Sequence, residues 1–287
     1  MNTRAETLAA LTWLIEAGAD EATAEEPVNR FRPGTPRESA PAGGAQAEHK
    51  AIRAVAPPPP RDIGQRAGSG GANVSAEAVS LSTPAGAARA LAAGCGTLDE
   101  LRQALINFDG CGDLKRAAKN MVFADGTPGY GIMLIGEAPG RDEDEQGLPF
   151  VGRAGKLLDR MLAAIALDRS KVYITNVLNW RPPQNREPSP EEAAACLPFL
   201  HRHIALAQPK LIVLLGAVSV RHVLGLNEGI MRARGRWETY QNPQLGHPVP
   251  VMPTLHPAFL LRQPGAKRLV WRDLLTILDK MEQLGLA

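Results

Sequence analysis

The chain has 287 residues, of which 44% are hydrophobic, and a formal net charge of +2. This length is sufficient for one full hydrophobic core, and the small charge excludes no partner, because DNA binding depends on a local basic face rather than on a high total. The sequence has no apolar run long enough to cross a bilayer and does not begin with a signal-peptide pattern, so we expect a cytoplasmic protein without a membrane partner.

The first quarter of the chain divides into two parts. Residues 1–26 contain a short apolar segment around Trp13 and Leu14, which predicts one helix that docks on the main domain or on a partner. Residues 27–75 are rich in Pro, Gly and Ala with hardly an aromatic residue, and such a composition cannot bury enough surface to offset the entropy of ordering. We therefore predict a disordered linker over 27–75 and a folded domain over 76–287.

The folded domain begins with two predicted helices and continues as strands that alternate with helices. The helices cover 75–93 and 97–108, and the second opens with a capping box that starts at Thr97. Apolar runs predict four strands, and helical patterns lie between and after them: strands at 131–136, 172–178, 211–216 and 250–255, helices at 155–166, 190–207, 217–224 and 267–284. This alternation predicts an α/β fold with a mainly parallel four-stranded sheet and helices on both faces.

Three of the predicted strands run directly into loops with distinctive sequences. The segments are GIMLIGEAPGRDEDEQGLPFVGRAG at 131–155, VYITNVLNWRPPQNREPSP at 172–190 and PVMPTLHPAFLLR at 250–262. In an open α/β sheet, ligands bind beyond the carboxyl ends of the strands. The first loop is therefore the expected floor of an active site.

In this order the three segments resemble the motifs of family 4 uracil-DNA glycosylases, over roughly residues 110–280. The resemblance implies a three-layer α/β/α sandwich and an enzyme that flips uracil out of DNA, hydrolyses its N-glycosidic bond and leaves an abasic site for base excision repair. The implied partner is single- or double-stranded DNA that contains uracil, and we expect a monomer. The motif loops contain no lysine, apart from Lys156 on the following helix, which argues against a Schiff-base lyase.

The resemblance also assigns the residues that bind the base. Phe150 would stack on the flipped uracil, while Gly136 and Ala138 would line the pocket. Asn176 would read the Watson-Crick edge, because an amide accepts a hydrogen bond from uracil N3–H while it donates to O4. A core position for Phe150 and a turn-capping role for Asn176 are the alternatives.

Catalysis requires a donor to uracil O2, where negative charge develops, and an anion that orients the attacking water. The resemblance places His256 at O2, against the alternative of a structural histidine. Glu137 is our preferred partner of the water, but Glu143 and Asp144 are further carboxylates in the same loop, and the choice among them stays open. The resemblance implies that Glu143 crowds the base C5 and so excludes thymine.

Contacts to DNA are expected beside the same loops. The predicted residues are Asn185, Arg186, Leu260, Arg262, Lys267 and Arg268. Leu260 belongs to an apolar segment that would wedge into the gap left by the flipped base, and the basic residues that follow would touch phosphates. The alternative is that these charges form an ordinary solvated face.

Family 4 enzymes typically hold a four-iron four-sulfur cluster on four cysteines, whereas this chain has three cysteines. Cys111 and Cys196 stand at family positions, Trp180 replaces a third ligand, and Cys95 lacks the family spacing. Because a cluster requires four converging ligands, we predict that the cluster is lost, that no cofactor or metal is bound, and that Trp180 fills the vacated space.

Two alternative functions were considered for the same sequence. The first is a protein that traps uracil-DNA covalently, which in a related group requires a histidine in the loop after the second motif; the loop here has none. The second is a catalytically silent DNA-binding module, against which Phe150, Asn176 and His256 argue. Whether hypoxanthine or xanthine is accepted stays open.

Overall fold

The structure is a computed structural model that describes residues 83–286, so the helix and linker predicted in residues 1–75 lie outside the described residues. Six strands form one sheet, in the order β1-β3-β2-β4-β6-β5. Their bounds are β1 Asp125–Gly126, β2 Ile132–Gly136, β3 Tyr173–Asn176, β4 Leu211–Leu215, β5 Glu238–Tyr240 and β6 Val249–Thr254. In the described range no helix is both long and apolar enough to span a membrane.

The four predicted strands are the parallel centre of this sheet. β3, β2, β4 and β6 pair in parallel, and every residue of β2, β3 and β4 is buried, as expected for strands that are covered on both faces. β1 and β5 extend the sheet as antiparallel edge strands. The predicted mainly parallel α/β fold is therefore confirmed, and the sheet is wider and more mixed than the four predicted strands.

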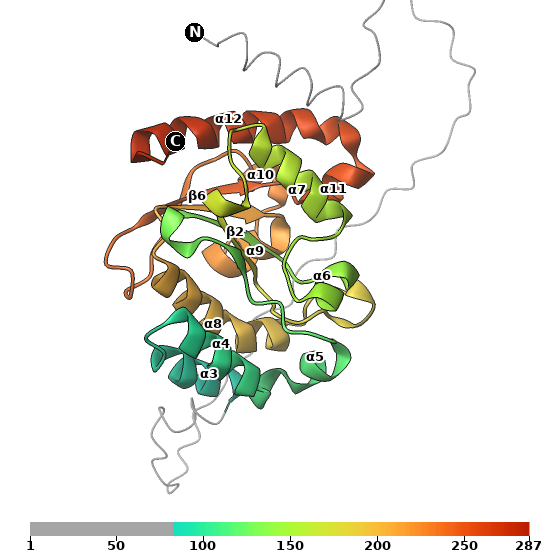
Figure 1. The fold of residues 1–287 in the computed structure, drawn as a ribbon, viewed down its shortest axis with the longest axis vertical. Coiled ribbons are helices and arrows are strands. Elements are labelled where there is room, and N and C mark those ends of the chain that lie inside the picture. The colour runs from blue at the N-terminus through green and yellow to red at the C-terminus, as the bar shows by residue number, and fades with distance from the viewer. Residues whose placement is uncertain (1–82, 287) are drawn as a thin grey trace, which may run out of the picture. The chain divides into compact units, whose positions relative to one another are not determined.

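Helices cover both faces of the sheet (Figure 1). They are α3 Pro84–Ala93, α4 Leu98–Asn107, α5 Gly112–Ala117, α6 Arg141–Gln146, α7 Arg153–Ala163, α8 Pro190–Ala207, α9 Ala217–Leu224, α10 Ile230–Ala233, α11 Pro257–Arg262 and α12 Lys267–Leu284, with short 3₁₀ turns η1 Asp109–Cys111, η2 Pro128–Tyr130, η3 Arg169–Lys171, η4 Pro183–Asn185 and η5 Pro264–Ala266. α4 and α8 begin at capping boxes, in which a Thr or Ser side chain and a Glu three residues later exchange hydrogen bonds with the backbone.

Three apolar cores hold these layers together. The first packs α7 and α12 against one face of the sheet, and the second packs α8 and α9 against the other, which gives the three-layer sandwich that was expected. The third, which we call the N-terminal core, lies between α3, α4 and α8 and contains Phe108, Cys111, Trp180, Cys196 and Phe199. This last core lies directly behind the loops that follow β2 and β3, since Ala138 and Leu178 pack in it.

A buried ion pair anchors the end of β6. Asp273 on α12 is 1% exposed and accepts hydrogen bonds from Thr254 Oγ1 at 2.6 Å and from Arg234 Nε at 3.0 Å. Gly235 N also donates to Pro253 O at 3.0 Å. Because a buried carboxylate must be paired to be tolerated, this network fixes the strand end that leads to His256.

Candidate active site

The site lies where the parallel strands end. Gly136 and Asn176, the last residues of β2 and β3, are directly paired in the sheet. The pairing continues past both strands, since Val177 N donates to Gly136 O and Leu178 N donates to Glu137 O, each at 3.0 Å. The two predicted uracil-binding loops therefore leave the sheet side by side.

Phe150 returns to this edge from the far end of the first loop. Its ring is 5% exposed, and its centroid lies 5.5 Å from that of His256. A Cβ atom on Gly136 would lie 2.6 Å from Phe150 Cζ and 2.4 Å from Asn176 Oδ1, which no side chain tolerates. Gly136 is thus required for the aromatic ring and the amide to converge, and the structure brings together four of the predicted site residues.

The Phe150 backbone has a left-handed φ of 55°, an unfavourable conformation for an aromatic residue that its neighbours stabilise. Arg169 donates a hydrogen bond to Pro149 O at 3.1 Å and another to Phe150 O, while its guanidinium pairs with Asp125 at 2.6 Å. Gly155 is also needed, because a Cβ there would lie 1.6 Å from Phe150 O. Arg169 was not predicted as a functional residue, because its partners are distant in the chain and no local pattern marks it.

Asn176 has an unusual environment for a polar side chain. It is 3% exposed, and its Oδ1 is the one buried side-chain oxygen or nitrogen within residues 83–286 that has no hydrogen-bond partner. Leaving such an atom unsatisfied costs about 1–3 kcal/mol. An amide oxygen that capped a turn would have a backbone donor, so the geometry instead favours an oxygen that receives a donor from a ligand.

His256 is held as a neutral donor. Its Nδ1 accepts a hydrogen bond from Ala258 N at 3.1 Å at the start of α11, so the proton of the neutral ring is assigned to Nε2. Burial, and secondarily the charge of Arg262, lowers the pKa of His256 to about 4. The imidazole is therefore uncharged at neutral pH and keeps an N–H with which to stabilise a developing anion.

The three candidate carboxylates have different environments. Glu143 is buried and accepts hydrogen bonds from Gly152 N at 2.8 Å and from Gly140 N at 3.1 Å. These bonds join the residue before α6 to the residue before α7. Asp144 is buried and accepts from Lys119 N at 2.8 Å. Both carboxylates therefore hold the loop in place.

Glu137 differs from both. In the described range it makes no hydrogen bond or ion pair through its side chain, and it is half-buried at the base of the loop. Burial raises the pKa of its carboxyl, the nearby charge of Glu187 raises it further, and Arg221 lowers it. Its carboxylate is thus free to bind a water molecule, which favours Glu137 over the other two.

Residues 123–275 match the family model of the uracil DNA glycosylase superfamily. The type-4 uracil-DNA glycosylase of Pyrobaculum aerophilum is 39% identical over 179 residues, which are 62% of this chain and 91% of that protein. This chain belongs to the type-4 uracil-DNA glycosylases. The enzymes of the same name from Sulfurisphaera tokodaii and Archaeoglobus fulgidus are 38% and 41% identical over 182 and 172 residues, or 62% and 58% of this chain and 81% and 85% of theirs.

One predicted DNA contact of this type-4 glycosylase is wrong. The predicted wedge Leu260 is 0% exposed and packs in the core with α7, because residues 257–262 form the helix α11 and not an extended loop. Its neighbour Leu261 is 38% exposed, since adjacent residues of a helix point in different directions. Leu261, rather than Leu260, presents an apolar side chain to solvent.

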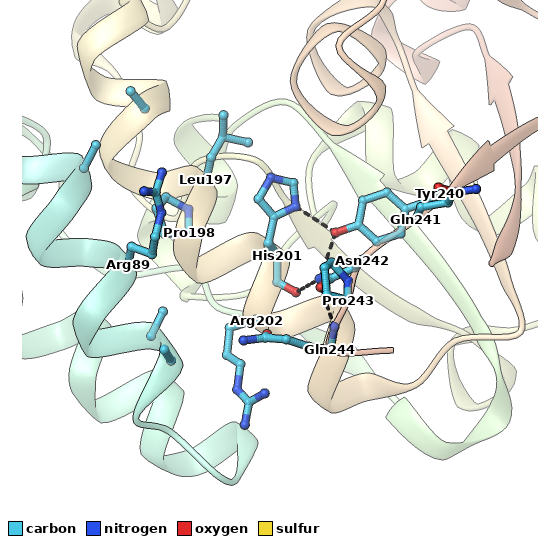
Figure 2. Close-up of a pocket in the computed structure, with 14 residues that line it drawn as sticks. Arg89, Leu197, Pro198, His201, Arg202, Tyr240, Gln241, Asn242, Pro243 and Gln244 are labelled. Atoms are coloured by element: carbon cyan, nitrogen blue, oxygen red, sulfur yellow. Dashed lines mark hydrogen bonds between the residues drawn. The ribbon is translucent and has the colours of Figure 1, made fainter. Parts of the chain in front are cut away.

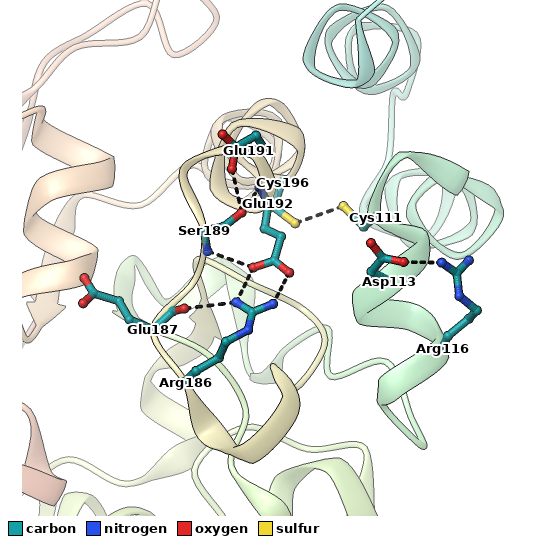
Figure 3. Close-up of polar contacts among 9 residues, drawn as sticks. All are labelled: Cys111, Asp113, Arg116, Arg186, Glu187, Ser189, Glu191, Glu192 and Cys196. Atoms are coloured by element: carbon teal, nitrogen blue, oxygen red, sulfur yellow. Dashed lines mark hydrogen bonds and ion pairs between the residues drawn. The ribbon is translucent and has the colours of Figure 1, made fainter.

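The predicted polar contacts to DNA differ in their exposure and in their hydrogen-bond partners. Arg262 and Arg268 are exposed, and Lys267 is half-buried. Asn185 is exposed and accepts from Arg181 Nε at 2.7 Å. Arg186 instead forms a two-pronged ion pair with Glu192, at 2.7 and 2.5 Å, which fastens the loop to the start of α8 (Figure 3). A phosphate would have to compete with Glu192 for Arg186.

The residues at the family's cluster positions do not fit an iron-sulfur cluster. The sulfur atoms of Cys111 and Cys196 are 3.3 Å apart, in direct contact (Figure 3), and these are the two family positions that hold a cysteine. Trp180, which stands at a third family position, is 4% exposed and packs in the same core. The Cys95 thiol donates to Leu91 O, and the described residues contain no group of three or more Cys, His, Asp or Glu side chains that could hold a metal.

A cavity of about 710 Å³ lies between α3, α8 and residues 240–244 (Figure 2). Its polar wall is the contact between His201 Nδ1 and the Tyr240 hydroxyl, at 2.7 Å. Tyr240 pairs with Val249 at the amino end of β6, so the cavity lies at the opposite end of the strands from the glycosylase site. None of the predicted site residues lines it.

Proposed function

We propose that this protein is a monofunctional uracil-DNA glycosylase that acts as a cytoplasmic monomer on single- or double-stranded DNA. It flips uracil out of the strand, hydrolyses the N-glycosidic bond and leaves an abasic site for base excision repair. The observation that carries this proposal is the buried, unpartnered Oδ1 of Asn176 beside the ring of Phe150. An aromatic face and an unsatisfied acceptor together suit a flat base with an N–H on its edge.

Each residue then has a defined task. Phe150 stacks on the base, and Asn176 accepts from N3–H while its amide nitrogen donates to O4. Cytosine lacks the N3 proton and presents an amino group in place of O4, so both hydrogen bonds would be lost. Glu143 holds the loop that carries the pocket, and its proposed contact with the base C5 would exclude the thymine methyl group.

Bond cleavage leaves the electron pair on the uracil ring and positive character on the sugar. The Nε2–H of His256 stabilises the negative charge on O2, and the low pKa keeps the ring neutral for this task. Glu137 binds the attacking water, accepts its proton as the bond to C1′ forms, and stabilises the positive sugar. Leu261, Arg262 and Arg268 contact the DNA on either side of the flipped nucleotide.

The direct test is release of free uracil from a single-stranded oligonucleotide with one uracil, followed by alkaline cleavage at the abasic site. A matched oligonucleotide with thymine is the control. Uracil release without a covalent adduct supports the proposal. A stable protein–DNA adduct would indicate the trapping function, and tight binding without release would indicate a catalytically silent module.

The pH dependence of kcat/KM is expected to follow the ionisation of the Glu137 carboxyl group. Its carboxyl must be ionised to bind the water, so the rate falls as the pH drops through its pKa, which lies above the ordinary value of 4.5. Glu187→Gln is expected to move this acid limb to lower pH, because it removes a repelling charge. Arg221→Gln is expected to move the limb the other way. If Glu137→Gln keeps the wild-type rate and limb, another carboxylate orients the water.

We also propose that the enzyme works without an iron-sulfur cluster. The purified protein is expected to be colourless, with no absorbance in the visible region and no stoichiometric iron by elemental analysis, because two cysteines in contact cannot supply four converging ligands. The same absorbance and iron measurements are made on the Thermotoga maritima type-4 glycosylase, 42% identical over 160 residues, purified in the same way. A brown preparation with bound iron would contradict the proposal.

The domain boundaries give a further prediction. We propose that residues 76–287 are the glycosylase domain, that 27–75 are a linker, and that 1–26 contain a docking helix. Removing residues 1–75 is then expected to leave the rate on short oligonucleotides within a few fold, because all three motif loops lie beyond residue 130. Loss of activity or solubility on truncation would place the N-terminal segment in the core of the domain.

A further inference from the structure

The contact between Cys111 and Cys196 joins two elements that are far apart in the sequence. Cys111 ends the turn η1, and Cys196 lies in the second turn of α8. Their side chains point toward each other with sulfur atoms 3.3 Å apart (Figure 3). Cys111 is 3% exposed and Cys196 is 0% exposed. A disulfide bond requires about 2.05 Å, so the sulfur atoms need to approach by little more than 1 Å.

The two cysteines lie together in an apolar core. Phe108 and Trp180 belong to the same apolar core as the two cysteines. Phe108 packs on Phe199 of α8 with ring centroids 5.1 Å apart. The two thiols therefore share an apolar environment with one another as their nearest reactive partner.

Solvent reaches the pair from one side. A cavity of about 660 Å³ is lined by Cys111, together with Gly112, Arg186, Ser189 and Glu192, whereas Cys196 does not line it. A small polar oxidant that enters this cavity meets Cys111 first. Because the cavity reaches Cys111 and not Cys196, Cys111 is the nucleophile and Cys196 the resolving thiol.

We infer that Cys111 and Cys196 are a modification site at which hydrogen peroxide closes an intrachain disulfide. The Cys111 thiolate attacks one peroxide oxygen and the O–O bond breaks, which yields a sulfenic acid and hydroxide. The Cys196 sulfur then attacks the Cys111 sulfur, forms the S–S bond and expels the oxygen as water. In sum, two thiols are oxidised to a disulfide, one peroxide is reduced, and two waters form. The inference rests on the proposed absence of a cluster.

The disulfide would join residues that are 85 positions apart, and the segment it closes contains the loops after β2 and β3. Cross-links that close long segments stabilise a fold chiefly by restricting the unfolded chain. The melting temperature is therefore expected to rise by roughly 5 °C or more on oxidation. The rate of uracil release is expected to stay within about twofold, because the sulfur atoms are already in contact and the catalytic loops need not move.

The experiment uses the full chain. Reduced protein is treated with hydrogen peroxide, quenched with catalase, denatured and alkylated, and its free thiols are counted by mass. We expect the count to fall from three to one, with a peptide map that links Cys111 to Cys196, and dithiothreitol to restore both the thiols and the original melting temperature. Three free thiols after oxidation of folded protein would overturn the inference, as would a disulfide that involves Cys95.

Two variants serve as matched controls. Cys95→Ala removes a buried thiol outside the pair. After peroxide treatment, both remaining thiols of this variant are expected to be oxidised to the disulfide, with the same rise in melting temperature. Cys196→Ser is expected to form no intrachain disulfide and to show no rise. Iron is measured in the same samples. Iron-free protein that keeps three free thiols would overturn the proposed disulfide alone. Stoichiometric iron would overturn both this inference and the proposal that the enzyme works without a cluster. Uracil release is assayed separately and tests the glycosylase function.

Discussion

Replacing His256 by alanine is expected to reduce the rate of uracil release by about a hundredfold or more, the usual effect of removing a preorganised donor from a developing oxyanion. Binding of a uracil oligonucleotide is expected to change by no more than a few fold, because the hydrogen bond to O2 strengthens mainly in the transition state. Single-turnover uracil release and an equilibrium binding assay measure the two effects separately. Equal losses of binding and rate would make His256 a structural residue.

Two further variants distinguish catalysis from folding. His256 also accepts from Ala258 N at the start of α11, so alanine removes a helix cap as well as a donor. Asparagine is a good cap and keeps an acceptor there, but it does not place an N–H where Nε2 lies, so His256→Asn is expected to restore stability without restoring the rate. His247→Ala, in an exposed loop, is expected to leave the rate unchanged. Because the pKa of His256 is about 4, its protonation is expected to reduce the wild-type rate only near that pH.

Replacing Asn176 by aspartate is expected to reduce uracil release by a hundredfold or more and to relax or invert the preference for uracil over cytosine. A carboxylate can accept from N3–H but cannot donate to O4, and an unpaired charge in this buried position opposes the base. The protonated acid offers the pattern that cytosine requires, so residual cytosine release is expected to rise as the pH falls. Oligonucleotides with a single uracil or cytosine, assayed over a pH series, give both rates.

Asn185→Asp is the matched control for this substitution, because Asn185 is the exposed amide of the same loop region and bonds to Arg181. It is expected to leave the ratio of uracil to cytosine release unchanged. If Asn176→Asp keeps the wild-type rate and discrimination, the base edge is read by another group, and the unpartnered Oδ1 needs a different explanation.

The sequence predicts the centre of this fold well because fully buried strands are continuous apolar runs, as at Ile132–Gly136 and Leu211–Leu215. The edge strands β1 and β5 are two and three residues long, too short to show any alternation. Leu260 was misplaced because an apolar segment after a strand does not reveal that it will form a helix with one buried face.

The site shows the same division. The pocket residues Gly136, Phe150 and Asn176 lie in motifs that the chain displays, so they were predicted, and the structure brings them together. The support of the loop was not predictable. Arg169 acts on the Pro149 and Phe150 carbonyls from about 20 positions away, and its role emerges only once the chain has folded. The residues that are predicted to touch the ligand lie in recognisable motifs, whereas the residues that hold them act through long-range contacts.

The continued backbone pairing between the loops after β2 and β3 has a mechanical consequence. Asn176 is joined to Gly136 in register, and Glu137 O is bonded to Leu178 N one step further on. The backbones that carry Asn176, the predicted reader of the base edge, and Glu137, the predicted partner of the water, therefore share one stretch of ladder. We therefore expect a base that displaces the Asn176 backbone also to shift Glu137, so that recognition of the base and hydrolysis would be lost together.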